Sequence, residues 1–231
     1  MAYTFSFTLT DSSTTRYYSD EIIVAEDDWE IGLVNFQSYY SIPNVTLDND
    51  RILTITVDDN YNFIRLPVGA YTLEDLNSAI NTKLFPGQYV NLTLHGPTNR
   101  VHLRSNLDID FREGSLAPLL GFNPGRYIHD RDHYAQHAPN LAPVEMIRIH
   151  CNIVQGSYEE EAHAHILHEF SPTIPTGYKI IEAPDHVIYL PLNVKRITEI
   201  TLRVTDQDNK PLDFRGERIY IRLELKRRSW G

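Results

Sequence analysis

Ten histidines are the residues best able to do chemistry in this sequence of 231 residues. Three of them, His163, His165 and His168, form an H-x-H-x-x-H motif. On a β-strand, His163 and His165 would share a face and could bind a metal ion through two imidazoles, whereas His168 would point to the other face. The acidic run at 159–161 is typical of a solvated turn. We therefore expect these histidines to flank the start of a strand and to hold no metal.

A second set of histidines recurs every four residues, at His129, His133 and His137. They would line one face of a helix, but prolines at 124, 139 and 143 surround them and no apolar stripe accompanies them. A pH-sensitive loop is one hypothesis, because imidazole titrates near neutral pH. An exposed loop over residues 123–143 explains the spacing more simply.

Signatures of catalysis are missing from the sequence. It contains no nucleophile elbow, zinc-protease, phosphate-binding or dinucleotide-binding motif. His150 and Cys151 are neighbours, so on a strand they face opposite sides and cannot form a base–nucleophile pair; Cys151 is predicted to be a small core residue. The acidic pairs at 27–28, 58–59 and 206/208 stand at turn-like positions, where Asp is favoured. We expect no enzyme and no cofactor.

Composition narrows the class of protein further. Hydrophobic residues make up 42% and charged residues 23%, as in ordinary globular proteins. A single Cys excludes a disulfide framework and a Cys-based zinc site, and it favours a reducing compartment. No run of 18 apolar residues is present, which predicts no membrane contact, and residues 1–10 do not resemble a signal peptide. We expect a protein made inside the cell and not secreted.

Two kinds of surface residue are candidates for contact with partners. Net charge is −10, which opposes non-specific wrapping of nucleic acid. The basic run Lys226, Arg227 and Arg228 is predicted either to make a weak contact with nucleic acid or a neighbouring subunit, or simply to keep the last strand in solution. The dipeptides Tyr17-Tyr18 and Tyr39-Tyr40 are candidate interface aromatics that could equally stack on sugars.

Alternation of apolar and polar residues predicts that most of the chain forms β-strands. The clearest strand has Tyr3, Phe5, Phe7 and Leu9 on one face. Further strands are expected near 31–35, 52–56, 144–154 and 187–192, and two more, at 197–204 and 219–225, are joined by a turn at 205–210.

One segment predicts a helix, at residues 72–84, where Thr72 and Asp75 form a capping box and leucine or isoleucine recurs at helical spacing. A helical turn is expected at 115–120, before Gly121. Many strands together with one helix and one helical turn predict an all-β sandwich or barrel with a small α+β elaboration. We expect one domain over residues 1–231, in which 69–122 forms a helix-containing inserted subdomain.

Several longer strings carry a family resemblance. They are IGLVNFQSYYSIPN at 31–44, GAYTL at 69–73, LLGF at 119–122, HEFSP at 168–172, PTGYKI at 175–180, VIYLP at 187–191, DQD at 206–208 and FRGE at 214–217. As an ordered set over nearly the whole chain, they resemble the minor capsid (penton) proteins of Polinton/Maverick elements, the adintovirus-like transposons of animal genomes. At 209–211 the sequence departs from that pattern, because a glycine-bearing turn is expected there.

The resemblance implies a single jelly-roll β-sandwich with a structural role at the fivefold vertices of an icosahedral, virus-like shell. It also implies a virion location, assembly as a homopentamer and a double jelly-roll major capsid protein as partner. The resemblance supplies no catalytic or metal-binding residues.

Two other functions stay open at this point. A non-catalytic receptor- or carbohydrate-binding β-sandwich would be monomeric or trimeric and would carry a concave, aromatic-lined site. A metal-dependent enzyme on a jelly-roll scaffold would need a cluster of His and Glu inside the barrel.

Overall fold

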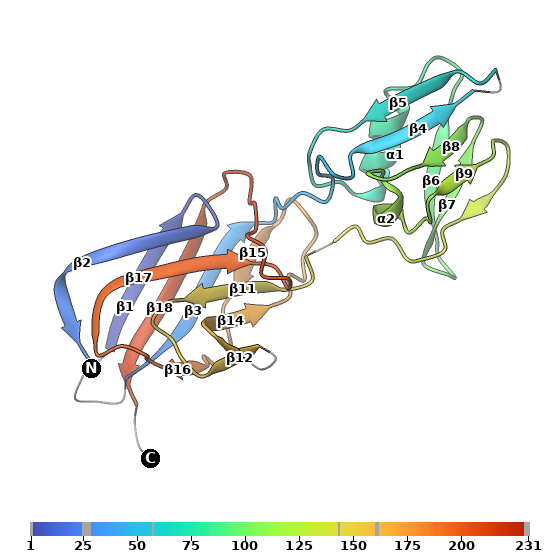
Figure 1. Cartoon of the computed structure of the whole chain (residues 1–231). Coiled ribbons are helices and arrows are strands. Elements are labelled where there is room, and N and C mark those ends of the chain that lie inside the picture. The colour runs from blue at the N-terminus through green and yellow to red at the C-terminus, as the bar shows by residue number, and fades with distance from the viewer. Residues whose placement is uncertain (1, 25–28, 57, 143, 160–161, 229–231) are drawn as a thin grey trace. The chain divides into compact units, whose positions relative to one another are not determined.

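The computed structural model describes residues 2–24, 29–56, 58–142, 144–159 and 162–228 (Figure 1). The chain divides into two compact units, Met1–Ile42 with Val144–Gly231, and Pro43–Pro143. Among the described residues, no helix is both long enough and apolar enough to span a membrane.

The first unit consists of two antiparallel sheets. Sheet A has the order β1 (Ala2–Leu9), β18 (Ile219–Arg227), β3 (Trp29–Tyr39) and β15 (Lys179–Glu182), and β16 (Tyr189–Pro191) also pairs with β3. Sheet B has the order β14 (Ile166–Phe170), β11 (Ile147–Cys151), β17 (Arg196–Thr205) and β2 (Ser13–Ile23). A hairpin of β12 (Ser157–Glu159) and β13 (Ala162–Ala164) completes the unit.

The strand pairing in this unit is that of a jelly roll. The first strand pairs with the last (β1 with β18), the second with the next to last (β2 with β17), and likewise β3 with β15 and β11 with β14. This is the pattern of one long antiparallel hairpin rolled so that its strands alternate between two sheets. The predicted all-β, single jelly-roll fold is confirmed.

Side-chain alternation places the core between the two sheets. Along β1, Phe5, Phe7 and Leu9 are buried while the residues between them are exposed. Along β18, residues 219, 221, 223 and 225 are buried in the same way. Burial along both strands alternates with the predicted period of two, because one face of sheet A meets the core and the other meets solvent.

The turn after β17 does not form a hairpin with β18. Asp206 Oδ1 accepts hydrogen bonds from the backbone N–H groups of Asp208 and Lys210, at 2.9 and 2.8 Å, so the predicted turn is present. However, β17 pairs with β11 and β2, whereas β18 pairs with β1 and β3. Residues 211–218 carry the chain from one sheet to the other, and the period of two does not reveal such a crossing.

Gly32 allows strand β16 to lie against β3. A Cβ built at Gly32 would meet Val187 Cγ1 at 2.5 Å and the carbonyl oxygen of Ile188 at 2.9 Å. Gly32→Ala should therefore lower the free energy of unfolding of this unit by about 1–3 kcal/mol, the usual cost of overpacking. Chemical denaturation measures it. Gly96→Ala is the control, because a Cβ there meets nothing within 4 Å, and an equal loss in both variants would contradict the argument.

The second unit has its own sheets and its own core. Its larger sheet, sheet C, has the order β5 (Tyr61–Arg65), β4 (Arg51–Ile55), β8 (Asp108–Phe111) and β9 (Gly125–Tyr127). The smaller sheet has the order β10 (His133–Tyr134), β7 (Arg100–Ser105) and β6 (Val90–His95). The buried residues of this unit form a cluster separate from the jelly-roll core.

The predicted helix is present as α1 (Leu73–Asn81), and its capping box is formed as expected by Thr72 and Asp75. Leu76 and Ile80 are buried on its inner face. The helix ends three residues before the predicted residue 84. The shorter turn is α2 (Ala117–Leu120), which ends at Gly121 with φ of 80°.

The second unit is longer than the expected inserted segment 69–122, which lies inside it. It also includes β4, β5, β9 and β10, and Asn44 joins its two ends. The Asn44 side chain, 3% exposed, donates to the carbonyl oxygens of Tyr71 and Leu141, both at 2.8 Å. Residues 52–56 alternate like a sandwich strand, and alternation alone does not tell which sheet a strand joins.

Candidate assembly surface

The basic run at the C-terminal end of β18 makes contacts within its own sheet. Lys226 lies opposite Glu30 of β3, and its Nζ is 3.5 Å from Glu30 Oε1 and 3.5 Å from the ring centroid of Tyr189. Arg227 lies opposite Trp29, with its guanidinium carbon 5.4 Å from the indole centroid. The first two of the three predicted contact residues therefore also stabilise this end of the sandwich.

Tyr189 is held in its neutral form at this place. Its hydroxyl donates a hydrogen bond to Glu224 Oε2. This hydrogen bond, together with burial and the charges of Glu224 and Glu30, raises the pKa of Tyr189 to about 12. The phenol is therefore a hydrogen-bond donor across the physiological range.

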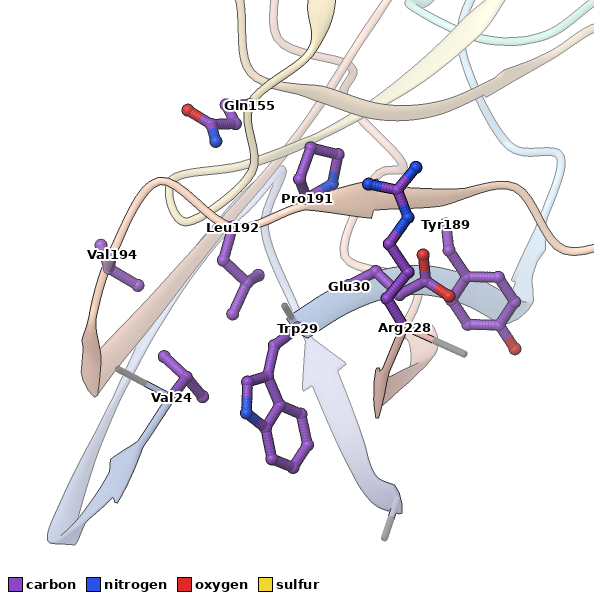
Figure 2. A pocket seen from close by; sticks show the side chains of 9 residues that line it. All are labelled: Val24, Trp29, Glu30, Gln155, Tyr189, Pro191, Leu192, Val194 and Arg228. Atoms are coloured by element: carbon purple, nitrogen blue, oxygen red, sulfur yellow. The ribbon is translucent and has the colours of Figure 1, made fainter. Parts of the chain in front are cut away.

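A hollow of about 280 Å³ lies beside these residues (Figure 2). Figure 2 shows Trp29 with Leu192, Val24 and Val194 on one side of it, and Tyr189, Glu30 and Arg228 on the other. Trp29 is only 6% exposed, and its Nε1 has no hydrogen-bond partner within the described part of the chain. An indole buried to this extent cannot offer the flat face on which a sugar ring stacks.

The four candidate tyrosines divide into two exposed and two covered residues. Tyr17 is 78% and Tyr39 51% exposed, whereas Tyr40 is 3% exposed. Tyr18 packs edge-on against Phe5 with ring centroids 5.5 Å apart. Burial raises the pKa of both Tyr18 and Tyr40. Tyr17 and Tyr39 are thus available to a partner, while Tyr18 and Tyr40 serve the core.

Sequence reasoning missed an apolar group on the outer face of sheet A. Ile181 and Tyr220 flank Gln37 in one cross-strand row, next to Tyr39, and they are 61% and 43% exposed. We call Tyr39, Ile181 and Tyr220 the sheet A patch. Of the adjacent residues Ile180 and Ile181, only Ile180 is buried. The sequence does not show which of the two faces the core, because that depends on how β15 pairs with β3.

His165 and His168 of the H-x-H-x-x-H motif contact different groups. The side chain of His163 lies outside the described part, as do Asp27 and Asp28. His165 Nδ1 lies 2.7 Å from the Val154 carbonyl oxygen, and His168 Nε2 lies 3.1 Å from Glu182 Oε1. No cluster of three His, Cys, Asp or Glu suited to a metal ion occurs among the described residues.

Cys151 belongs to the core between the two sheets, and His150, its neighbour on β11, is buried outside that core. Cys151 is fully buried, and burial raises the pKa of its thiol to about 12, so the reactive thiolate is not formed near neutral pH. His150 Nε2 lies 2.9 Å from Thr205 Oγ1.

The second histidine set lies in a segment that was predicted to be a loop but contains β9 and β10, with His133 as the first residue of β10. His133 Nε2 lies 2.8 Å from the Ile128 carbonyl oxygen, and His137 N donates to the Gly121 carbonyl oxygen at 2.9 Å. His129 contacts Asp108 of β8, whose carboxylate accepts from His129 N and Arg126 Nε at 2.7 Å and lies 2.7 Å from His129 Nδ1. Burial alone would raise the pKa of Asp108, but these hydrogen bonds outweigh it and lower the pKa.

This cluster should make the second unit sensitive to acid. A lowered carboxyl pKa contributes stability that is present above the unfolded pKa of about 4 and is lost as pH falls through the folded pKa. Asp108→Asn should cost about 2–3 kcal/mol at pH 7 and flatten the dependence below pH 4. Amide exchange of β8 measures both. Asp132→Asn, at the half-exposed partner of His102, is the control, and an unchanged acid slope in Asp108→Asn would contradict the prediction.

Comparison with known proteins finds similarity in structure. No protein-family model matches the sequence, and no curated protein matches it either. The crystal structure of the mavirus penton protein is similar over 99% of this chain and 100% of that chain, with a TM-score of 0.54 and 11% sequence identity. A chain of the Sputnik virophage structure has a TM-score of 0.46 and 13% identity over 98% of each chain. The likeness to the mavirus penton protein shows a shared fold.

Proposed function

We propose that this protein is a structural minor capsid (penton) protein, which occupies the fivefold vertices of an icosahedral shell encoded by a Polinton/Maverick-type element. The observation that carries the proposal is the fold similarity to the mavirus penton protein, because it spans both chains from end to end. The similarity therefore includes the second unit, which is inserted between β3 and β11, as well as the jelly roll.

In this role the protein acts as a homopentamer. Heterologous contacts between unlike sides of neighbouring copies close into a ring when the rotation between them is right. The sheet A patch and the exposed Tyr17 of sheet B are suited to such contacts, since aromatic side chains are enriched at protein interfaces. The cognate double jelly-roll major capsid protein surrounds the ring.

The test measures the mass of the protein in solution, alone and with the cognate major capsid protein. We expect five copies in the ring and incorporation into shells at the vertices. Ile181→Lys should keep the fold and lose incorporation, whereas Phe85→Lys, at a similarly exposed residue of the second unit, should incorporate normally. A stable ring of any other number, or failure to join shells, would contradict the proposal.

Assembly should also depend on salt. Each copy carries a net charge of −10, so like charges repel as copies approach. Raising the ionic strength from about 0.01 to 0.15 M shortens the Debye length from about 30 to 8 Å, and light scattering should show faster assembly. Slower assembly at higher salt would show that attraction between charges drives the contact instead.

Contact between the basic run and packaged DNA stays a prediction. Lys226 is paired with Glu30, whereas Arg227, which also lies over Trp29, and Arg228 have exposed side chains. Two phosphate contacts predict a slope of about −2 in the logarithm of DNA affinity against that of salt concentration. The double variant Arg227→Ala with Arg228→Ala should lose this salt dependence of DNA binding.

A further inference from the structure

Strand β5 lies at an edge of sheet C, the larger sheet of the second unit (Figure 1). Among the described strands it pairs only with β4. Natural proteins usually protect such an edge with Lys, Pro or a bulge, because an open edge can pair with another chain. The sequence of β5, YNFIR, contains neither Lys nor Pro, and its pairing with β4 runs without a register shift.

The hydrogen-bond pattern shows which residues face the open edge. Leu66 N donates to the Asp50 carbonyl oxygen at 2.8 Å, and Thr56 N donates to the Asn60 carbonyl oxygen at 3.0 Å. Hydrogen-bonded positions alternate along an antiparallel pair, so residues 62 and 64 direct their N–H and C=O groups toward β4. Tyr61, Phe63 and Arg65 therefore direct theirs away from β4, toward the open edge.

The same three residues present their side chains on one face. Ile52 and Ile64 belong to the core of the second unit, so Tyr61 and Phe63 lie on the opposite face, where they are 59% and 64% exposed. Their cross-strand neighbours there, Ile55 and Leu53, are 1% and 3% exposed. The edge thus offers two exposed aromatic side chains, whereas Ile55 and Leu53 are already covered and present no surface to a partner.

One end of this face carries two like charges directly opposite each other. Arg65 pairs with Arg51, and side chains are closest in such pairs that do not exchange hydrogen bonds. Arg51 Nε has an ion pair with Asp50 Oδ1 at 3.2 Å, whereas Arg65 has no ion pair among the described residues. A carboxylate placed next to Arg65 would relieve this repulsion.

We propose that β5 is a docking edge for an extended segment of another protein, which adds a strand beside it. The segment carries apolar side chains next to Tyr61 and Phe63 and an acidic side chain next to Arg65. Main-chain hydrogen bonds supply affinity and the alternate side chains supply specificity, as in other strand additions. This recognition site is separate from the ring contacts of the jelly roll and does not depend on them.

The edge favours a polypeptide over a nucleic acid. It offers C=O groups as well as N–H groups, and phosphates cannot donate to a carbonyl. Asp108 and Asp110 lie on the same face of sheet C, as cross-strand neighbours of Ile55 and Leu53. Asp108 is already paired with Arg126 and Asp110 with Arg112, so neither competes with an incoming acidic side chain for Arg65.

The test uses the whole protein and a synthetic heptapeptide with capped ends, in which two valines and one aspartate alternate with threonines. NMR titration should shift the amide signals of residues 61, 63 and 65 and slow their hydrogen exchange. The aspartate peptide should bind at least tenfold more tightly than its lysine counterpart. Arg65→Glu, at an exposed residue, should reverse this order, and Phe63→Thr should weaken both peptides.

Four results would overturn the proposal. One is equal binding of the aspartate and lysine peptides, and another is unchanged binding by a peptide whose edge-facing N–H groups are methylated. A third is a larger shift of the same signals by oligothymidylate, which would identify a nucleic-acid site. The fourth is concentration-dependent self-association without peptide, lost in Phe63→Thr, which would make a second copy of this chain the occupant.

Discussion

Replacing Phe36 by alanine should lower the free energy of unfolding of the jelly-roll unit by about 3–5 kcal/mol. Phe36 is fully buried on β3, and its ring lies 5.2 Å from that of Phe170 on β14 and 6.3 Å from that of Phe214. It therefore joins sheet A to sheet B. Alanine removes these contacts and leaves a cavity, because the two sheets are each held by their own hydrogen bonds and cannot collapse onto it.

Amide hydrogen exchange measures this loss separately in the two units. Because the two cores share no buried residue, the amides of β6 and β7 should keep their protection while those of β3 and β18 lose it. Phe85→Ala, at a residue that is 63% exposed, is the control and should change neither unit by more than about 0.5 kcal/mol. Equal loss of protection in both units would show that they unfold as one, against the proposal of a separate inserted subdomain.

The parts of the fold that depend on neighbouring residues could be predicted from the sequence. Thr72 and Asp75 cap α1 because both partners of each hydrogen bond lie within one turn. The alternation of β1 follows from one buried face. In contrast, the assignment of β4 to the second unit depends on its partners β5 and β8, and no local pattern specifies them.

The candidate surface was predicted less well, for the same reason. Charge alone singled out Lys226, but the register of β18 against β3 sets it opposite Glu30. Two adjacent tyrosines looked alike in sequence, yet Tyr39 faces out and Tyr40 faces the core. Ile181 and Phe63 escaped notice because exposure of an apolar residue on a strand is known only once the buried face has been identified.

Gly121 should be the most sensitive position of the second unit. It ends α2 with φ of 80°, where an L side chain is strained. A Cβ there would meet the His137 carbonyl oxygen at 2.3 Å and the Ala138 carbonyl oxygen at 3.0 Å, both of them backbone atoms. The backbone of residues 137–138 is held beside Gly121 by hydrogen bonds. His137 N donates to the Gly121 carbonyl oxygen and Asn140 N to that of Leu119, both at 2.9 Å. The clash cannot be relieved by rotation of a side chain.

Gly121→Ala should therefore cost about 4 kcal/mol, of which the positive φ supplies about 1–2 and the displaced backbone the rest. Gly177→Ala separates the two contributions, since Gly177 has φ of 85° but nothing within 4 Å of an added Cβ. It should cost only about 1 kcal/mol, in the first unit. Amide exchange at α2 and β7 measures the loss in Gly121→Ala, and amide exchange at β3 and β15 measures the loss in Gly177→Ala. An equal loss of stability in both alanine variants would contradict the argument, because strain in φ alone would then explain the cost at Gly121. The loop 135–140 would in that case have to move aside freely. Its hydrogen bonds to Val101, Leu119 and Gly121 oppose such a movement.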